Sequence, residues 1–443
     1  NYDQHRDIRF RPERALWRDD GLPFKVQFFH PGWLFRETVQ IHELDGKRDI
    51  ALPFSRRFFD YGKNDFGESF PREMGYAGFR LHYALNRPEY LDELAVFLGA
   101  SYFRALGKGQ CYGLSARALA VDTAAPTGEE FPVFREFWLQ RPAAEAREVV
   151  VYALIDSKRV TGAYRFAITP GTDTVVRVRA TIYLREPVAT LGLAPFSSMF
   201  WHGENSGTTN GDYRPEVHDS DGLLVAHNTG EWLWRPLANP KQLRTSMLSS
   251  ENVRGFGLLQ RDRDFDHYQD LEAHYHQRPS VWVEPVGNWG RGSIELVEIP
   301  TPDETSDNIV AFWTPEKCPA VGEPYEFEYD LHWLTDLGRR PPGGYVVATR
   351  QSTVMNHPEL RRMVVDFGGG PVVKHSDGVE GIVSVGTGAS LAGVVAQRNP
   401  NNNTWRLAFE VKPDGSGRPV EMRAFLRKGD NVLTETWSYL WQP

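Results

Sequence analysis

Cysteine is scarce in this chain of 443 residues, which holds only Cys111 and Cys318. The chain has no CxxC pair and neither a GxxxxGKS nor a GxxxxGKT sequence, which argues against a cysteine-based zinc site and a nucleotide-binding P-loop. Two cysteines far apart in sequence fit a reducing compartment, and equally an exported protein that does not depend on disulfides. Cysteine usage therefore leaves the localisation open.

Long apolar runs and clusters of basic residues are also missing. No apolar run reaches the roughly 18 residues that a membrane-spanning helix needs, so we expect a protein that does not span a membrane. The formal net charge is -8, and Lys and Arg are scattered singly, without the basic stripe that a phosphate backbone demands. We therefore expect no nucleic-acid partner.

Helical periodicity is sparse, and strand patterns prevail. Between residues 148 and 185, apolar and polar residues alternate in three runs that are separated by turn clusters. This pattern predicts three successive antiparallel strands. One face of the last run is wholly apolar and is predicted to be buried, namely Val176, Val178, Ala180 and Ile182.

Similar short runs, bounded by Gly, Pro, Asn and Asp, recur at 231–237, 255–260, 281–286, 293–299, 308–313 and 325–333. Their spacing predicts a large all-β sandwich rather than βαβ units. We expect one helix at 87–100, where a proline and acidic residues stand near the start and a glycine near the end. A second helix is predicted at 131–142.

The stretch DLGRRPPGGYVV, at 336–347, joins two basic residues to Pro-Pro-Gly-Gly and predicts a linker, because it cannot continue a strand or a helix. Seven strand-like segments follow, at the spacing of an immunoglobulin-like sandwich. We therefore predict a large β-sandwich domain over 1–336, a linker over 337–344 and a small immunoglobulin-like domain over 345–443.

The segment 196–223 is rich in polar groups and contains YRPEVHDSDGL. Loops longer than about 12 to 15 residues are uncommon unless they carry function or are disordered, and the aromatic residues of this segment argue against disorder. Asp219 and Asp221 have three interpretations here: caps of a turn before the next strand, a catalytic carboxylate, or a DxD metal site.

The sequence HYHQR, at 274–278, places His274 and His276 on one face if it is extended, as a pair of metal ligands would require. No third ligand of the HExxH kind stands beside it. Structural or substrate-contacting histidines and a tyrosine are the favoured interpretation, and we predict no metal and no cofactor for this chain.

A second group of acids lies at 300–313, where Asp303, Glu304 and Asp307 precede an apolar strand. They either form a solvated turn or hold carboxylates over a sheet edge. Two separate acid clusters with aromatic residues nearby are what glycoside hydrolysis needs, because one carboxylic acid protonates the leaving oxygen and one carboxylate activates water.

Nucleophilic catalysis by serine or cysteine is not favoured by the sequence. The surroundings of Ser115, YGLSARA, are not GxSxG and carry no signal for an oxyanion hole. Cys111 lies in a Gly-rich stretch that predicts a turn followed by a strand.

Several long stretches resemble one known family. FDYGKNDFG, GYAGFRLHYALN, ELAVFLGASYFRALGKGQCYGLSARALAVDT, YRPEVHDSDGL and DNIVAFWTP are similar to the periplasmic glucan biosynthesis proteins, the OpgG and OpgD family. The resemblance runs over essentially the whole chain. It implies an exported periplasmic protein, although no signal peptide appears in this sequence, with a large β-sandwich followed by an immunoglobulin-like domain.

The resemblance also implies an activity on the β-1,2-linked glucose backbone of osmoregulated periplasmic glucans. We expect inverting endo-hydrolysis of β-1,2-glucan. One alternative is a transglycosylase that cyclises the same glucan. A different class is a non-catalytic glucan-binding scaffold for a membrane glucosyltransferase.

The resemblance also implies roles for individual residues. The general acid is Asp307, with Glu304 nearby, the base-side carboxylate is Asp219, and Tyr275 lies along a water relay. Arg214 or His218 is expected to favour the ionised form of Asp219, and both are expected to contact the substrate. Asp221 is expected to support a turn or the substrate. The candidates for stacking on glucose rings are Trp201, Tyr213, Trp232, Trp234, Trp282, Trp289 and Trp313.

Overall fold

The computed structural model describes residues 1–66, 74–207, 211–335, 338 and 341–443. Nearly all of its regular structure is β-strand, which confirms the predicted all-β class. The chain divides into two compact units. The first comprises Asn1–Ser197, Val281–Glu295 and Phe312–Thr335, and the second comprises Ser198–Ser280, Leu296–Ala311 and Asp336–Pro443.

The first unit contains two large groups of paired strands. One runs in the order β2-β6-β7-β8-β9-β15, with β10 beside β15. Its strands are β2 (Lys25–Phe29), β6 (Gly78–Arg87), β7 (Tyr90–Leu98), β8 (Tyr102–Ala105), β9 (Ser115–Arg117), β10 (Leu119–Val121) and β15 (Leu191–Ser198). The short strands β1 (Arg9–Phe10) and β5 (Phe59–Asp60) pair separately.

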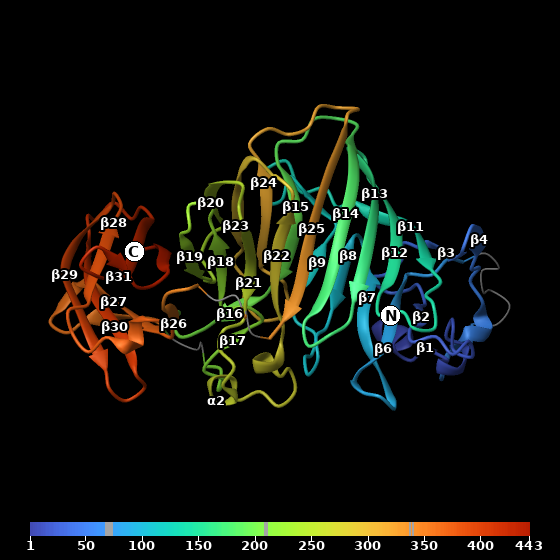
Figure 1. The fold of residues 1–443 in the computed structure, drawn as a ribbon, viewed down its shortest axis with the longest axis horizontal. Coiled ribbons are helices and arrows are strands. Elements are labelled where there is room, and N and C mark those ends of the chain that lie inside the picture. The colour runs from blue at the N-terminus through green and yellow to red at the C-terminus, as the bar shows by residue number, and fades with distance from the viewer. Residues whose placement is uncertain (67–73, 208–210, 336–337, 339–340) are drawn as a thin grey trace. The chain divides into compact units, whose positions relative to one another are not determined.

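The other group runs in the order β22-β25-β14-β13-β12-β11-β3-β4. Its strands are β22 (Ser280–Val286), β25 (Pro324–Leu334), β14 (Thr174–Leu184), β13 (Val160–Thr169), β12 (Val149–Asp156), β11 (Val133–Gln140), β3 (Gln40–Asp45) and β4 (Arg48–Ala51). Figure 1 shows β12, β13 and β14 as neighbouring long strands, with β25 beside them. Helical turns in this unit are short: α1 (Tyr2–Arg6), η1 (Pro12–Arg14) and η2 (Arg56–Phe58).

The alternating pattern of the third predicted strand is confirmed in β14. Its apolar face is at most 1% exposed at Val176, Val178, Ala180 and Ile182, and the intervening residues are half-buried or exposed. Successive side chains of a strand point to opposite faces of the sheet, so this alternation buries one face of β14 in the core of the unit.

Both predicted helices are wrong. Residues 87–100 contain the end of β6 and all of β7, and residues 131–142 contain β11. In β7, Leu94, Ala95 and Phe97 are buried, because the strand pairs with β6 on one side and β8 on the other. Tertiary pairing and burial override the local helix signals, since β7 buries its apolar residues in a sheet.

The second unit contains the strand order β28-β31-β33-β19-β18-β21, with β32 beside β31, and a four-stranded sheet in the order β26-β27-β30-β29. The first set is β18 (Gly222–Ala226), β19 (Trp232–Pro236), β21 (Gly255–Leu259), β28 (Glu380–Val385), β31 (Val420–Lys428), β32 (Asn431–Val432) and β33 (Thr436–Trp441). The four-stranded sheet is β26 (Tyr345–Val354), β27 (His357–Gly368), β29 (Ala389–Asn399) and β30 (Thr404–Pro413).

Shorter elements complete the second unit. They are the pair β16 (Phe200–His202) and β17 (Val217–His218), the strand β20 (Arg244–Glu251), the helix α2 (Phe265–Tyr268) and the turns η4 (Tyr275–Gln277) and η5 (Val372–Lys374). The strands β23 (Arg291–Glu298) and β24 (Ile309–Pro315) have residues in both units. The loop between them, 299–308, belongs to the second unit.

The predicted strands of the C-terminal 100 residues all occur, as β26 to β33. Strand β33 lies parallel to β19, with Leu233 opposite Thr436. The predicted linker, 337–344, lies partly outside the described residues, at 337 and 339–340. The division into domains at 337–344 stays a prediction.

Candidate active site

The stretch HDSD does not form a solvated loop. His218 ends β17, and β18 begins at Gly222. His218 and Ser220 are fully buried and Asp219 is 3% exposed. The backbone N–H of Asp219 donates to the carbonyl of Met199 over 2.8 Å. Short strands on either side therefore hold these polar residues in the interior of the second unit.

The two aspartates of this stretch have different partners. Asp219 forms an ion pair with Arg278. Asp221 Oδ2 accepts hydrogen bonds from the backbone N–H groups of Arg261 and Asp262, over 2.9 and 3.0 Å. Burial raises the pKa of Asp221 to about 6. Asp221 thus caps a segment far away in sequence instead of its own turn, and the two carboxylates do not act as one DxD unit.

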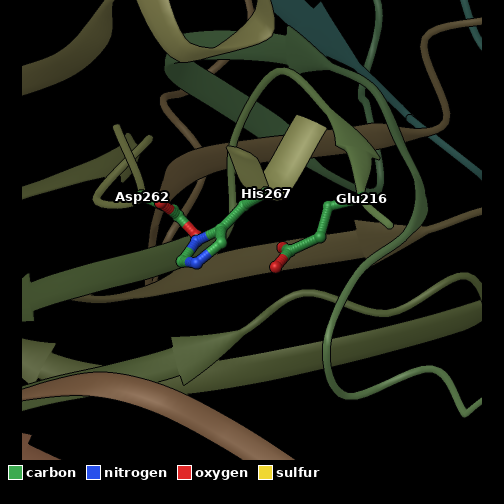
Figure 2. A group of neighbouring side chains, drawn as sticks. All are labelled: Glu216, Asp262 and His267. Atoms are coloured by element: carbon green, nitrogen blue, oxygen red, sulfur yellow. The ribbon is translucent and has the colours of Figure 1, made fainter. Parts of the chain in front are cut away.

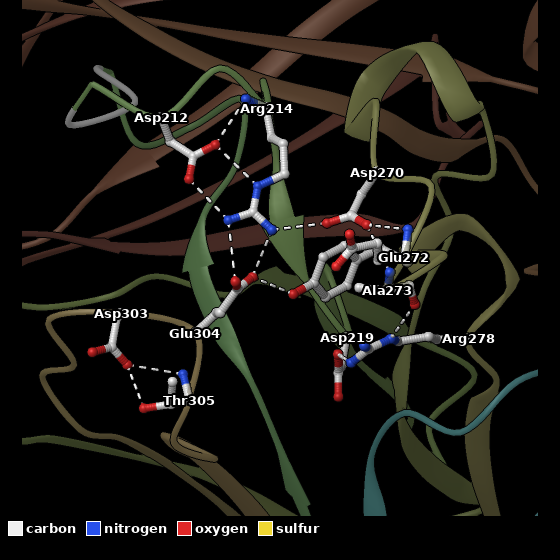
Figure 3. Close-up of polar contacts among 11 residues, drawn as sticks. Asp212, Arg214, Asp219, Asp270, Glu272, Ala273, Arg278, Asp303, Glu304 and Thr305 are labelled. Carbon is white, nitrogen blue, oxygen red and sulfur yellow. Dashed lines mark hydrogen bonds and ion pairs between the residues drawn. The ribbon is translucent and has the colours of Figure 1, made fainter.

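Arg214 brings together carboxylates from three segments of the second unit (Figure 3). Its guanidinium lies 2.8 Å from oxygens of Asp212, Asp270 and Glu304. The hydrogen bond with Arg214 lowers the pKa of Asp212 to about 2. Asp270 in turn accepts the backbone N–H of Glu272 over 2.8 Å, so the group is fixed to the main chain.

Glu304 links Arg214 to Tyr275. The hydroxyl of Tyr275 donates to Glu304 Oε2 over 2.5 Å. Burial raises the pKa of Tyr275 above its usual value, and the bond to Glu304 raises it further. The tyrosine therefore stays protonated at neutral pH and acts as the donor in this contact.

The ring of Tyr275 is fixed from both sides. It is 2% exposed and packs in a small core with Met199, Val217 and Tyr268. The guanidinium carbon of Arg278 lies 4.2 Å from the ring centroid, within the range of a cation–π contact. Arg278 therefore joins Tyr275 to Asp219, and a continuous series of contacts runs from Glu304 to Asp219.

Asp307 lies in the loop 299–308 and is exposed. Its neighbour Asn308 is 2% exposed. The Asn308 side chain accepts from Phe200 N over 2.8 Å and donates to the carbonyls of Phe200 and Ile299 over 3.0 Å. Asn308 thus anchors the loop directly beside Asp307.

The remaining acid of the loop forms a local turn. Asp303 Oδ1 accepts from the backbone N–H of Thr305 over 2.9 Å, and hydrogen bonds from Thr305 lower the pKa of Asp303. The three acids of the second cluster therefore differ: Asp303 caps a turn, Glu304 joins the Arg214 group, and Asp307 faces solvent.

His218 is fully buried, and neither of its ring hydrogen bonds reaches Asp219, which we expected it to support. Its Nδ1 lies 2.9 Å from Gln260 Oε1 and its Nε2 lies 2.9 Å from Glu216 Oε2. Burial favours the neutral ring, but the bond with Glu216 raises the pKa of His218 overall. Its role is to hold Glu216 and Gln260 in the interior. It does not contact Asp219 through any of these bonds.

The aromatic residues expected to stack on sugar divide by exposure. Tyr213 is 76% exposed, and Trp201 is half-buried against the small core around Tyr275. Trp313 is fully buried and Trp234 and Trp282 are 3% exposed, so these three rings belong to the protein core and offer no open face. Trp289 is half-buried in the first unit, and its ring centroid lies 6.2 Å from that of Trp313.

The HYHQR stretch is not extended. His274 has a left-handed backbone conformation with φ of 49°, and residues 275–277 form the turn η4. The rings of His274 and His276 meet edge to face, with their centroids 6.0 Å apart. The extended conformation that would place both histidines on one face is therefore not adopted, because residues 275–277 form a turn.

Sequence reasoning missed four residues of this group, the first of which is Asp212 beside Arg214. Arg278 pairs with Asp219, Asp270 holds Arg214, and Asn308 anchors the loop beside Asp307. Arg278 and Asn308 stand directly within the stretches HYHQR and SDNIV. For Arg278 and Asn308, closeness in sequence to the predicted residues is the only signal that a single sequence offers.

The chain matches, over residues 1–441, the family described as "Periplasmic glucan biosynthesis protein, MdoG". It belongs to this family. Similar proteins named "Glucans biosynthesis protein G" occur in Ralstonia nicotianae, with 49% identity over 100% of this chain and 90% of the relative, and in Pseudomonas paraeruginosa, with 48% identity over 98% and 85%. A third, from Sodalis glossinidius, is 47% identical over 98% of this chain and 86% of the relative.

These matches confirm the resemblance drawn from the sequence stretches. The name of this family refers to the synthesis of periplasmic glucans. The family match therefore supports a role in that synthesis for this chain. Among the described residues, no helix is long and apolar enough to cross a membrane.

Proposed function

We propose that this chain is a periplasmic glycoside hydrolase that cleaves the backbone of β-1,2-glucan internally and with inversion. The observation that supports it is the series of contacts from Glu304 through Tyr275 and Arg278 to Asp219. Its two ends are carboxylates from the two acid clusters, and the exposed Asp307 lies in the same loop as Glu304.

Asp307 is the general acid of this proposal. A general acid must reach the glycosidic oxygen of a bound polysaccharide, and Asp307 is exposed on a loop whose base is held by Asn308. Proton donation to the leaving oxygen is the step that a second carboxylate cannot perform from the opposite side of the sugar ring.

Asp219 is the base-side carboxylate. It is 3% exposed, and a buried carboxylate needs a compensating charge, which Arg278 supplies. Inverting enzymes keep the two carboxyl groups about 6.5 to 9.5 Å apart so that water fits between base and anomeric carbon. A base that acts through a relay can lie farther away.

Tyr275 is the relay group, and Glu304 is its positioning residue. In the proposed relay the attacking water gives a proton to the Tyr275 hydroxyl while that hydroxyl passes its own proton to Asp219, directly or through a second water. Before this step the hydroxyl donates to Glu304 over 2.5 Å, and Arg214 holds Glu304 with two nitrogens, over 2.8 and 3.2 Å. The hydroxyl must therefore turn from Glu304 toward Asp219 for the transfer.

Purified protein incubated with linear β-1,2-glucan tests the proposal. We expect shorter linear oligosaccharides whose new reducing ends have the α-configuration in early NMR spectra. Asp307→Asn and Asp219→Asn should each lower the rate at least about a hundredfold. Asp303→Asn is the matched control, because it changes an acid of the same loop while the amide oxygen can still cap Thr305.

The other outcomes distinguish the alternatives. Cyclic products or a new linkage identify a transglycosylase. Glucan that is bound but unchanged identifies a scaffold protein, which could assist a membrane glucosyltransferase. Full activity of either carboxylate variant refutes the role given to that residue.

A further inference from the structure

Three side chains outside the proposed catalytic group lie close together in the second unit: Glu216, Asp262 and His267. Each offers a donor atom, and these atoms all lie within 4.8 Å of one another. Figure 2 shows the His267 imidazole between the carboxylates of Asp262 and Glu216. Glu216 precedes β17, Asp262 follows β21, and His267 lies in α2, so the fold brings together donors from three segments.

Two of these donors are already held in place. Glu216 is 7% exposed and is fixed by His218 Nε2 at 2.9 Å, while the other nitrogen of His218 is bonded to Gln260. Asp262 Oδ1 accepts the backbone N–H of Asp264 over 3.0 Å, and its Oδ2 contacts His267 Nδ1. Outer contacts of this kind orient metal ligands in proteins.

A second observation comes from Asp221. Asp221, Glu216 and Asp262 line the same small cavity of about 40 Å³. Asp221 Oδ1 is buried and has no hydrogen-bond partner among the described residues. A buried carboxylate oxygen without a donor is costly, and a bound cation nearby would offset that cost.

The acids that line this cavity are only partly neutralised. They are Glu204, Glu216, Asp221 and Asp262, and Glu204 forms an ion pair with Arg350 at 2.8 Å. Arg261, the arginine of the lining, is shared with Glu435, 2.6 Å away. The three acids Glu216, Asp221 and Asp262 therefore outnumber the permanent cation of the lining, which favours a divalent cation.

We propose that Glu216, Asp262 and His267 form a binding site for a zinc-class divalent ion. One imidazole and two carboxylates are a borderline-soft donor set, which suits zinc better than calcium or magnesium, whose ligands are oxygens. Binding replaces the contact between His267 and Asp262 with one bond from each side chain to the ion, and a water molecule completes a tetrahedral shell.

The distances are compatible with this ion. Ligands at about 2.0 to 2.2 Å from a tetrahedral zinc lie roughly 3.4 Å apart, so donors within 4.8 Å need only small side-chain movements. The His267 side chain is 49% exposed, which leaves the ion a path from solvent. The ion would tie α2 to the segments before β17 and after β21.

Metal binding is the test, and it does not depend on the hydrolysis proposal. Chelator-treated full-length protein is titrated with zinc chloride by isothermal calorimetry, and bound zinc is counted by mass spectrometry after dialysis. We expect one zinc per chain and a higher melting temperature with zinc. A visible absorption spectrum with cobalt in place of zinc would report the ligand geometry.

His267→Ala is the main variant, because its exposed side chain can be removed without opening the core. We expect its zinc affinity to fall at least tenfold, and Glu216→Gln to behave likewise. His357→Ala is the matched control, since His357 also faces a carboxylate, Glu359, at 3.1 Å on an exposed surface, and it should bind zinc like the unmodified protein.

Three results would overturn the proposal. They are no zinc retained by the unmodified protein, equal binding by His267→Ala, and a preference for magnesium or calcium over zinc. The first two remove the site, and the third leaves a hard-cation site in place of a zinc-class one.

Discussion

The Tyr275 hydroxyl is the smallest feature on which the proposed reaction depends. It donates to Glu304 over 2.5 Å while Arg278 covers the ring. Burial raises the pKa of Tyr275, so the group acts as a neutral donor and not as a phenolate. At this scale the candidate site consists of one hydroxyl held between a carboxylate and a guanidinium.

Tyr275→Phe should therefore lower kcat on β-1,2-glucan about a hundredfold with little change in KM, because the ring and its packing remain while the proton path is lost. The free energy of unfolding should fall by only about 1 kcal/mol, because one hydrogen bond is lost. Steady-state kinetics and calorimetry would measure the two effects.

Tyr268→Phe is the control for this variant. Tyr268 packs in the same core, with its ring centroid 6.0 Å from that of Tyr275, but its hydroxyl donates to the carbonyl of Asp262. An equal loss of kcat in both variants would show that the effect comes from packing and not from a relay.

At the scale of elements, the strand pair β18 and β19 lies directly beside Asp221. Gly222 opens β18 opposite Pro236 of β19, and a side chain at Gly222 would overlap the ring of Trp234. Arg261 also lies over the ring of Trp234, with its guanidinium carbon 3.7 Å from the ring centroid. Close packing at one glycine therefore connects the strand pair to the segment that binds Asp221.

Gly222→Ala should destabilise the protein by about 1 to 3 kcal/mol, because an extra methyl group in a packed core forces neighbouring side chains to move. Urea denaturation would measure this loss. Gly393→Ala in β29 is the matched control, since nothing lies within 4 Å of the added carbon there. A neutral effect of Gly222→Ala would mean that Trp234 can move freely.

Strand β23 contains a carboxylate whose ionisation opposes folding. Glu295 is 7% exposed, and burial raises its pKa above the usual value of 4.5. Above pH 4.5 the unfolded chain releases this proton while the folded chain retains it. The free energy of unfolding should therefore fall as pH rises from 4.5 through the folded pKa, and should then level off.

Glu295→Gln should remove this part of the pH dependence, because the amide does not ionise. Urea denaturation between pH 4.5 and 7.5 would compare the variant with the unmodified protein. Glu326→Gln is the control, since that side chain is 65% exposed. Parallel stability profiles for the unmodified protein and Glu295→Gln would contradict the prediction.

At the scale of the whole molecule, charge and ligand chemistry predict a weak response to salt. The chain carries a formal net charge of -8, whereas a β-1,2-glucan backbone is neutral. Screening acts on interactions between charges, so binding of an unmodified glucan should depend little on ionic strength.

Calorimetric titration of the Asp307→Asn variant with linear β-1,2-glucan would test this at 50 and 500 mM sodium chloride, concentrations between which the screening length falls about threefold. We expect dissociation constants within about threefold of each other. A steep loss of affinity at high salt would instead point to charged groups in the recognised ligand.

The all-β class and most strands could be predicted from the sequence, because strand alternation is local. β14 shows this directly, since every second residue from Val176 to Ile182 is buried as the pattern requires. The helix predicted at 87–100 was wrong. The segment contains β7, and the pairing of β7 with β6 and β8 cannot be inferred from the residues of that segment alone. Burial between distant strands decided the conformation there.

The residue types of the candidate site were also evident from the sequence, and the family match extends over residues 1–441. Only the tertiary structure decided their partners. Glu304 meets Tyr275 and Arg214 across 29 and 90 residues of chain, and Asp219 meets Arg278 across 59. Local pattern acts over a few residues, whereas these ion pairs and hydrogen bonds form only when separate strands and loops fold onto one another.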